Sequence, residues 1–199
     1  EQLPCVFDVS ARTVATQSLN IFGDHSDVYA CRQTGFAMLC ETNPQEVMDL
    51  SPVAHLATIE GKVPFINFFD GFRTSHEIQK IEKWDYADLK EMCNMDAVTA
   101  FRAHALNPEH PAMRGSHENG DVFFQHREAC NTAYNELPAI VEKYMTKINE
   151  KLGTNYDLFN YYGAEDADRV IVAMGSVNDV AEEVIDYLTA KGEKVGLIK

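Results

Sequence analysis

Apolar positions along this chain alternate between short runs of strand length and longer stretches with helical spacing. Residues 5–9 and 36–40 look like strands, the first of them buried, and residues 63–69 form a continuous run of the kind that a parallel sheet buries on both faces. Between the last two runs, apolar residues recur every three or four positions over residues 44–60, which predicts a helix. This strand–helix–strand order predicts a parallel crossover and therefore an α/β fold.

Signals at both ends of the predicted helix support this interpretation. Asn43 is a good N-cap residue and Glu46 follows three positions later, so the pair predicts a capping box. Gly61 is a natural helix end. Glu60 places a carboxylate at the unfavourable end of the helix dipole, so we expect a cationic partner such as Lys62.

Two further helical segments follow along the chain. Residues 84–106 have helical character with a break near Met95, and residues 134–152 form an amphipathic helix that ends at Gly153. Between them, residues 107–120 are rich in Pro, Gly, His and Asn. That composition predicts a long ordered loop.

The pattern then begins again. It predicts a strand at 169–174, a glycine turn, a helix at 177–190 and a strand at 194–198. Ser176 and Asp179 have the spacing of a second capping pair. This is the opening crossover of another α/β domain.

We therefore expect two domains, with residues 1–160 in the first and residues 163–199 at the start of the second. The second has too few elements to close its own core. The chain begins with Glu rather than Met and ends in what looks like a strand cut short, so we expect a fragment of a longer protein.

Composition and charge exclude several partner classes. The chain has 199 residues, of which 45% are hydrophobic and 24% charged, as is ordinary for a soluble globular protein. Its 17 Lys and Arg against 31 Asp and Glu give a net charge of −14. Such a surface repels nucleic acid and anionic membranes, so we expect neither as a partner. No segment approaches the ~20 apolar residues that a membrane-spanning helix needs.

The cysteines show no metal-binding pattern. They are Cys5, Cys31, Cys40, Cys93 and Cys130, and no two have the CxxC spacing of zinc or iron–sulfur ligands. The number is odd, and no N-terminal signal segment is visible. We expect an intracellular protein with reduced, mostly structural thiols.

The densest group of polar side chains follows the third apolar run. The sequence FFDGFRTSHE places Asp70, Arg73, His76 and Glu77 just beyond a strand, where α/β proteins bind ligands. Asp-Gly predicts a sharp turn, and the flanking phenylalanines supply apolar walls. The turn either shapes a pocket or subunit contact, or is fixed by a buried Asp–Arg pair; the residues alone favour the pair.

Arg12 follows the first strand. An arginine fork can bind a small carboxylate in bidentate fashion, but an ion pair with an acidic neighbour is the simpler interpretation. Residues 174–176, MGS, form a strand–glycine–helix turn of the kind that holds phosphate, although the GxGxxG pattern is missing.

Two other sets of polar residues are candidates for a functional site, but each has a simpler structural interpretation. Asp24, His25 and Asp27 offer ligands for a cation, but glycine followed by short polar residues more often makes a hydrogen-bonded turn. His55 falls within the predicted helix of residues 44–60 and is expected to be a packed or surface histidine.

Several long runs of this sequence, covering nearly the whole chain, carry a family resemblance. They are ARTVATQSLNIFGDHSDVYACRQTGFAML, EVMDL, PFINFFDGFRTSHEIQKIE, NPEHP, DRVIVAMGS and AKGEKVGLIK. Together they resemble the pyruvate:ferredoxin (flavodoxin) oxidoreductases. The resemblance implies that residues 1–160 are the C-terminal portion of the first domain, a thiamine pyrimidine-binding-like module. Residues 163–199 would open the second, transketolase C-terminal-like domain.

The resemblance also implies an activity for the whole enzyme. Pyruvate is oxidatively decarboxylated with coenzyme A to acetyl-CoA and CO2, and electrons pass to ferredoxin or flavodoxin. The implied cofactors are thiamine diphosphate with Mg and 4Fe–4S clusters, bound by parts outside this chain. A fused NADP-linked form carries the same domain, so the acceptor stays open. We expect a homodimer in the cytoplasm, or in a hydrogenosome-like organelle of an anaerobic eukaryote.

One site residue follows from the resemblance. The family places its substrate-carboxylate arginine in an SAR run after the first strand, which here is Arg12. The cofactor-activating glutamate and a substrate-contacting threonine are expected upstream of Glu1. The sequence departs from the family at Cys31 and over residues 40–43, where small residues are more usual, and we expect these changes to be neutral packing.

Two alternatives stay open. The first is a related 2-oxoacid:acceptor oxidoreductase with another substrate, against which the length of the FFDGFRTSHE match argues. The second is a non-catalytic α/β assembly module, which is consistent with the lack of a complete catalytic set in this chain.

Overall fold

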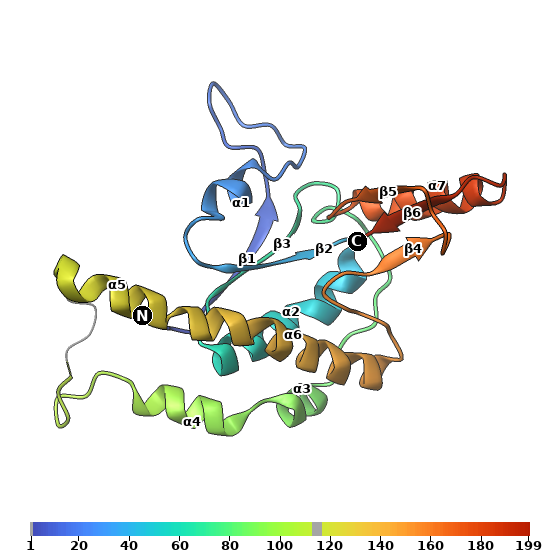
Figure 1. Ribbon diagram of the computed structural model, residues 1–199. Helices are drawn as coiled ribbons and strands as arrows, with labels where there is room; N and C mark the ends of the chain where they lie inside the picture. Colours follow the sequence, from blue (N-terminus) through green and yellow to red (C-terminus); the bar gives the residue numbers. More distant parts are fainter. Residues whose placement is uncertain (1, 113–116) are drawn as a thin grey trace.

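The computed structural model describes residues 2–112 and 117–199. Three strands, β1 (Val6–Ala11), β2 (Ala37–Glu41) and β3 (Phe65–Asp70), form a sheet in the order β1-β3-β2 (Figure 1). Both pairings are parallel. The strand at the centre is therefore the continuous apolar run, and its first four residues are buried as that pattern predicts.

Helices cover both faces of this sheet. Helix α2 (Pro44–Gly61) connects β2 to β3 and packs on one face together with α6 (Asn131–Leu152). The short helix α1 (Ser26–Cys31) packs on the other face, where Val28 clusters with Phe68. The predicted crossover and α/β fold are confirmed. The most deeply buried apolar residues between α2, α6 and β3 are Val53, Ala54, Ala57, Phe65, Tyr144 and Ile148.

Strand β1 lies at the edge of the sheet. Its Phe7 is 54% exposed and stacks on Phe36, with ring centroids 5.6 Å apart. The expectation of a buried strand at residues 5–9 is therefore wrong, because β1 has a partner on one side and little packing on its outer positions.

Helix α2 begins as the sequence predicts and ends one residue later. The Asn43 side chain accepts a hydrogen bond from the N–H of Glu46 at 3.0 Å, and the Glu46 carboxylate accepts one from the N–H of Thr42 at 2.7 Å. Gly61 is still helical, and Lys62 takes the left-handed conformation with φ 54°. Gly61 is therefore the last helical residue, and the left-handed position that follows the helix is taken by Lys62.

Glu60 has cationic and polar partners, but Lys62 is not among them. Its carboxylate accepts hydrogen bonds from Lys143 Nζ at 2.6 Å, Tyr144 Oη at 2.6 Å and Asn94 Nδ2 at 3.1 Å. Although burial opposes ionisation, these hydrogen bonds lower the pKa of Glu60 to about 2. The expectation that Glu60 has a cationic partner is confirmed, and that partner is Lys143 on α6.

The described residues between β3 and α6 form three helices. The predicted helical stretch forms α3 (Tyr86–Met92) and α4 (Met95–Ala103), with the break where the sequence placed it. Helix α5 (Gly120–Ala129) was not predicted. In the predicted loop at residues 107–120, residues 107–112 and 117–119 are irregular apart from an isolated bridge between Asn107 and His110, and Gly120 already belongs to α5. Residues 113–116 lie outside the described residues.

A second sheet follows, and we call residues 161–199 the C-terminal unit. Its strands β4 (Tyr161–Gly163), β5 (Arg169–Val172) and β6 (Val195–Ile198) lie in the order β4-β6-β5, and α7 (Val177–Thr189) connects β5 to β6. The predicted strand–helix–strand order is confirmed, whereas antiparallel β4 was not predicted. The buried core of this unit is small and consists of Ile185, Val195 and Leu197.

The structure also bears on what the sequence predicts about membrane-spanning helices and about the cysteines. Among the described residues, no helix is both long and apolar enough to span a bilayer. All five cysteines are free thiols. Burial, followed by the charges of Glu41 and Asp70, raises the pKa of the Cys40 thiol, so this cysteine is a neutral packing residue.

We expect hydrogen exchange to separate the two sheets. All four residues of β5 are exposed and Val172 is 74% exposed, whereas Ile66 and Phe68 on β3 are buried. Amides of β5 should exchange faster than those of β3 because few buried contacts oppose local opening. Mass spectrometry of exchanged peptides measures this. Equal protection of both strands would show that the C-terminal unit is held as firmly as the main core.

Glu41 is an unusual core residue. It is 0% exposed, and among the described residues neither its carboxylate oxygens nor Asn67 Oδ1 has a hydrogen-bond partner. Burial, followed by the charges of Asp8 on β1 and Glu46 on α2, raises the pKa of Glu41 well above its ordinary value of 4.5. The expectation of neutral packing over residues 40–43 is therefore wrong at Glu41, because a buried carboxylate without a donor is destabilising unless it is protonated.

Glu41 should make stability fall as the pH rises. The folded state keeps this proton to a higher pH than the unfolded state, so the contribution of neutral Glu41 is complete below the ordinary pKa. Between the ordinary pKa and the raised pKa, this contribution to the free energy of unfolding falls by about 1.4 kcal/mol for each pH unit. Urea unfolding of the parent chain and Glu41→Gln from about pH 5 to about pH 8 measures this. The variant should gain stability relative to the parent chain as the pH rises.

The matched control is Glu142→Gln, which makes the same chemical change at an exposed position of α6. Its pH profile should run parallel to that of the parent chain. If the Glu41→Gln profile also ran parallel, Glu41 would be ionised in the folded state and the assignment would fail.

Candidate functional site

Polar residues from several segments converge at the carboxyl end of the parallel sheet. Strands β1 and β3 pair in register with Ala11 opposite Asp70, so Arg12 and Gly71 follow side by side. The N–H of Gly71 donates to the carbonyl of Ala11 at 2.9 Å. The loop over residues 12–25, which extends beyond the end of β1 in Figure 1, therefore meets the turn after β3.

Asp70 is at the centre of this arrangement. Its Oδ1 contacts His25 Nε2, and its Oδ2 accepts hydrogen bonds from the N–H of Ser176 at 2.8 Å and from the Ser176 hydroxyl at 2.5 Å. Although burial opposes ionisation, the hydrogen bonds from Ser176 and His25 lower the pKa of Asp70. Arg73 is exposed and does not contact it, so the expected Asp–Arg pair is wrong.

Two glycines allow the loop and the turn to touch. A Cβ atom at Gly71 would lie 2.1 Å from Arg12 Nε, and one at Gly23 would lie 2.6 Å from the carbonyl oxygen of Gly71. Neither position has room for a side chain. The Asp-Gly pair therefore has two functions: Asp70 binds the neighbouring segments, and Gly71 lets the Arg12 side chain lie across the turn.

The rest of the turn is held by local contacts. Phe72 has φ 67°, a left-handed conformation that is unfavourable for a residue with a Cβ atom. Its N–H donates to Ser75 Oγ at 2.8 Å, and its ring packs edge-on against Phe22 with centroids 4.9 Å apart. The Thr74 hydroxyl donates to the carbonyl of Thr42 at 3.2 Å. These contacts stabilise a backbone that is unfavourable on its own.

Arg12 reaches across this turn. The backbone N–H of Arg12 donates to Asp27 Oδ2 at 2.8 Å. In the guanidinium, Nη1 donates to the carbonyl of Ile21, and Nη2 lies 3.4 Å from Ser75 Oγ. None of the ion pairs formed by the described residues involves Arg12. The simpler interpretation, an ion pair with an acidic neighbour, is therefore not what the structure shows.

The acidic cluster before α1 forms a hydrogen-bonded turn, as its composition favours. Asp24 Oδ1 accepts from the N–H and hydroxyl of Ser26 at 2.8 and 2.7 Å, and Oδ2 accepts from Thr13 Oγ1 at 3.0 Å. Hydrogen bonds from Ser26 lower the pKa of Asp24. His25 and Asp27 turn to other partners. Within the part of the chain that the structure describes, no three His, Cys, Asp or Glu residues are grouped to hold a metal ion.

The MGS turn holds an anion from the chain itself. Gly175 has φ 81°, and the N–H and hydroxyl of Ser176 bind the Asp70 carboxylate, which takes the place that the sequence suggested for a phosphate. The predicted capping pair is wrong, because Ser176 makes no capping hydrogen bond and Asp179 accepts from Asn43 Nδ2 at 3.3 Å. The turn therefore docks the C-terminal unit on the main sheet.

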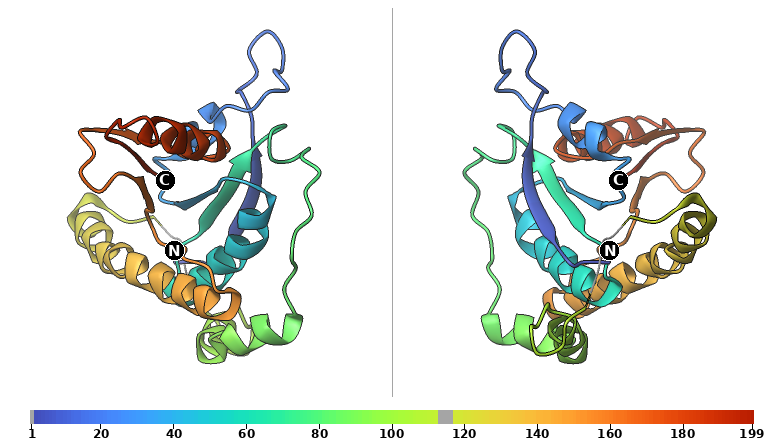
Figure 2. Two further views of the ribbon diagram at one scale, coloured as in Figure 1. Left: turned by 90° about the vertical axis from the view of Figure 1, so that its right-hand side faces the viewer. Right: turned by 90° about the vertical axis from the view of Figure 1, so that its left-hand side faces the viewer.

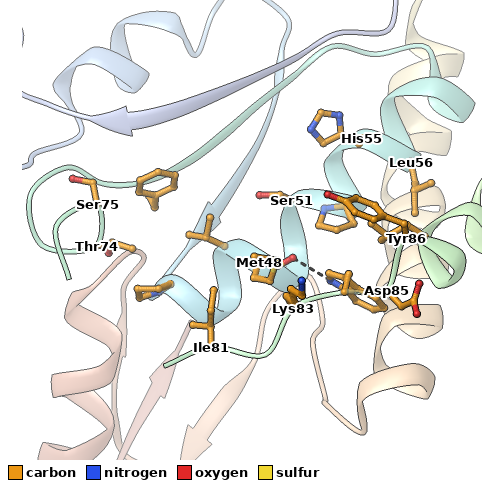
Figure 3. A pocket seen from close by; sticks show the side chains of 16 residues that line it. Met48, Ser51, His55, Leu56, Thr74, Ser75, Ile81, Lys83, Asp85 and Tyr86 are labelled. Atoms are coloured by element: carbon orange, nitrogen blue, oxygen red, sulfur yellow. Dashed lines mark hydrogen bonds between the residues drawn. The ribbon is translucent and has the colours of Figure 1, made fainter. Parts of the chain in front are cut away.

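A separate cavity of about 1000 Å³ lies between α2 and the extended segment that runs from the turn to α3 along one side of the molecule (Figure 2). Figure 3 shows Thr74 and Ser75 at one end of it. Trp84 Nε1 donates to the carbonyl of Met48 at 3.1 Å, and His55 is exposed at the rim, as expected of a surface histidine. The lining is mainly apolar and lacks both Arg12 and Asp70, so this cavity is not the candidate site.

Sequence reasoning named most of these residues but grouped them differently. Asp70 and His25 are 45 residues apart, and Asp70 and Ser176 are 106 residues apart. The first pair has a sequence signal, because both residues follow neighbouring parallel strands of the predicted sheet. Ser176 has none. His76 and Glu77 are exposed and do not contact Asp70.

Comparison with known proteins identifies the family. The model of the family described as pyruvate flavodoxin/ferredoxin oxidoreductase, thiamine diphosphate-binding, matches residues 1–146. The chain is 61% identical to a pyruvate-flavodoxin oxidoreductase of Enterobacter agglomerans and 57% identical to a pyruvate:ferredoxin oxidoreductase of Moorella thermoacetica. All of this chain is covered in both, but only 17% of each relative.

A solved structure has a similar fold. A 2-oxoglutarate:ferredoxin oxidoreductase from Magnetococcus marinus matches 99% of this chain and 37% of its own with a TM-score of 0.57 and 18% identity. At that identity the likeness concerns the fold alone. The family model covers nearly three quarters of the residues, and the chain therefore belongs to the thiamine diphosphate-binding domain family of the pyruvate flavodoxin/ferredoxin oxidoreductases.

Proposed function

We propose that the whole protein oxidatively decarboxylates pyruvate with coenzyme A, giving acetyl-CoA and CO2 and passing electrons to ferredoxin or flavodoxin. This chain is a piece of that enzyme, since it spans 17% of the length of the relatives it matches at 57–62% identity. One observation of the structure supports it most directly. Arg12 extends from the carboxyl end of a parallel sheet, and no carboxylate of the described residues pairs with its guanidinium.

In this proposal Arg12 binds the carboxylate of pyruvate. A planar guanidinium offers parallel N–H donors that match a carboxylate in bidentate geometry. The fork is pre-arranged, because Nη1 donates to the carbonyl of Ile21, Nη2 lies 3.4 Å from Ser75 Oγ, and the Gly71 backbone leaves room for the side chain. Holding the carboxylate in one orientation fixes the direction in which the adjacent carbonyl faces.

Thiamine diphosphate, when bound, supplies the nucleophilic carbon and accepts the electron pair left by loss of CO2. We place no contact to it on a residue of this chain. The cysteines are free and dispersed, and the described residues have no metal-ligating group of three, so they do not fit Mg or a 4Fe–4S cluster. Those groups are proposed for parts of the enzyme outside this chain. The role of this chain is to bind and orient substrate.

The remaining expectations are proposals of the same kind. We propose a homodimer in the cytoplasm, or in a hydrogenosome-like organelle if the source is an anaerobic eukaryote. The division into residues 1–160 and 163–199 as parts of two domains stays a prediction. The acceptor stays open between ferredoxin, flavodoxin and a fused NADP-linked module, since a pyruvate dehydrogenase (NADP+) of Cryptosporidium parvum is 52% identical over all of this chain.

The two alternatives make different demands on Arg12. A related oxidoreductase for another 2-oxoacid would keep the carboxylate anchor and prefer a larger substrate. A non-catalytic assembly module would need no anchor. The identities to pyruvate enzymes favour the pyruvate reaction, and substrate kinetics of the whole enzyme separate all three.

We expect Arg12→Ala in the full-length enzyme to lower kcat/KM for pyruvate by on the order of 10²-fold. Loss of a charge-assisted contact removes roughly 1.5–3 kcal/mol, and each ~1.4 kcal/mol is a factor of ten. Arg12→Lys should recover only part of the loss, because a point charge cannot reproduce the fork. Steady-state kinetics measures kcat/KM for pyruvate in each variant, and a thermal melt measures its folding stability.

The matched control is Arg102→Ala, which removes an exposed arginine from α4. Its kinetics and its melting temperature should stay close to those of the parent enzyme. A lowered melting temperature for Arg12→Ala with unchanged kcat/KM for pyruvate would make Arg12 a structural residue and end the anchor assignment.

A further inference from the structure

Asp70 connects three segments that are distant in the sequence. It ends β3, its Oδ1 contacts His25 at the start of α1, and its Oδ2 binds the N–H and hydroxyl of Ser176 before α7. Only 15% of its side chain and 18% of the His25 side chain are exposed. The carboxylate is therefore a largely desolvated junction between the main sheet, the loop over residues 12–25 and the C-terminal unit.

The contacts continue from this junction to the guanidinium. His25 holds the far end of the loop to Asp70, and Gly23 packs on the carbonyl of Gly71, where a Cβ atom would lie 2.6 Å away. Gly71 in turn lies under Arg12, whose Nε would be 2.1 Å from a Cβ atom there. The loop and the turn after Asp70 are therefore packed directly against each other.

We propose that Asp70 is a positioning residue, which fixes Arg12 through His25 and the turn and ties that position to the C-terminal unit through Ser176. The inference rests on the proposed function of Arg12 as the carboxylate anchor. It also gives a role to the Asp-Gly pair, which the function of Arg12 as the anchor does not explain by itself.

A carboxylate suits this position for a physical reason. Three donors meet at one side chain, and an ionised carboxylate accepts at both oxygens and donates at neither. The approach also depends on Gly175, because a Cβ atom there would lie 2.9 Å from both Asp70 oxygens. An asparagine at position 70 would present an N–H group toward one of these donors.

The test is a double-mutant cycle in the full-length enzyme. Arg12→Ala, Asp70→Ala and the double variant are compared by kcat/KM for pyruvate. If Asp70 acts through Arg12, Asp70→Ala alone should lower kcat/KM by roughly 10- to 100-fold, because small misplacements of an anchor are that costly. Added to Arg12→Ala it should change little, so the two effects should not multiply.

Three further variants keep the test decisive if Asp70→Ala folds poorly. His25→Ala removes the contact between the loop and Asp70, together with the packing of the His25 ring on Phe68, and leaves the Ser176 contacts in place. It should show the same non-additivity with Arg12→Ala. Ser176→Ala removes one donor of the C-terminal unit and should have a weaker effect. Asn178→Ala is the matched control: it breaks another contact between the C-terminal unit and the main sheet, to Thr42 Oγ1 at 3.3 Å, without touching the loop.

The outcomes separate this inference from the proposed function. If Asp70→Ala and Arg12→Ala multiply, or if Asn178→Ala lowers kcat/KM for pyruvate as much as His25→Ala does, Asp70 is a structural residue and the inference fails while the anchor stands. If Arg12→Ala leaves kcat/KM unchanged, the anchor itself fails. If the effects of Asp70→Ala and Arg12→Ala are not additive and Asn178→Ala leaves kcat/KM for pyruvate unchanged, both the inference and the anchor are supported.

Discussion

The register of β1 against β3 determines where each residue of the candidate site lies. Parallel pairing sets Ala11 opposite Asp70, so the two chains leave the sheet at the same level and Arg12 passes beside Gly71. A shift of one residue would turn each side chain of β1 to the opposite face and separate the loop from the turn. This register places Val9 and Ala11 of β1 in one apolar cluster with Phe68 of β3, and a slip by one residue would turn them away from that cluster.

Much of the main sheet could be predicted from the sequence because its signals are local. The continuous run of residues 63–69 predicted a strand that a parallel sheet buries on both faces, and the spacing over residues 44–60 predicted a helix with Asn43 as its cap. Arg12 was the one site residue assigned by resemblance, and the structure places it at the carboxyl end of β1, with no carboxylate of the described residues at its guanidinium. Local periodicity and capping chemistry are sufficient for the strand and the helix, whereas the assignment of Arg12 rests on the resemblance.

The features that the sequence did not predict depend on contacts between distant segments. Phe7 is exposed because β1 is an edge strand, which no run of apolar residues shows. Glu60 pairs with Lys143, 83 residues away, rather than with its neighbour Lys62. Asp70 binds His25 and Ser176 instead of the adjacent Arg73 for the same reason: the tertiary fold decides which donor reaches a carboxylate.

The acidic residues around Arg12 explain why its guanidinium is available in so acidic a chain. Asp24 binds Ser26 and Thr13, and Asp27 binds the backbone N–H groups of Arg12 and Val28.

Asp70, the third nearby acid, is held by His25 and Ser176. Each aspartate near the loop thus has its own donors, and none competes for the Arg12 side chain. A carboxylate that enters from solvent meets a cation already oriented by neutral groups, the carbonyl of Ile21 and the hydroxyl of Ser75. The proposed binding of an anionic substrate by Arg12 depends on this arrangement, because in a chain with a net charge of −14 an acid without its own donors would compete for the guanidinium.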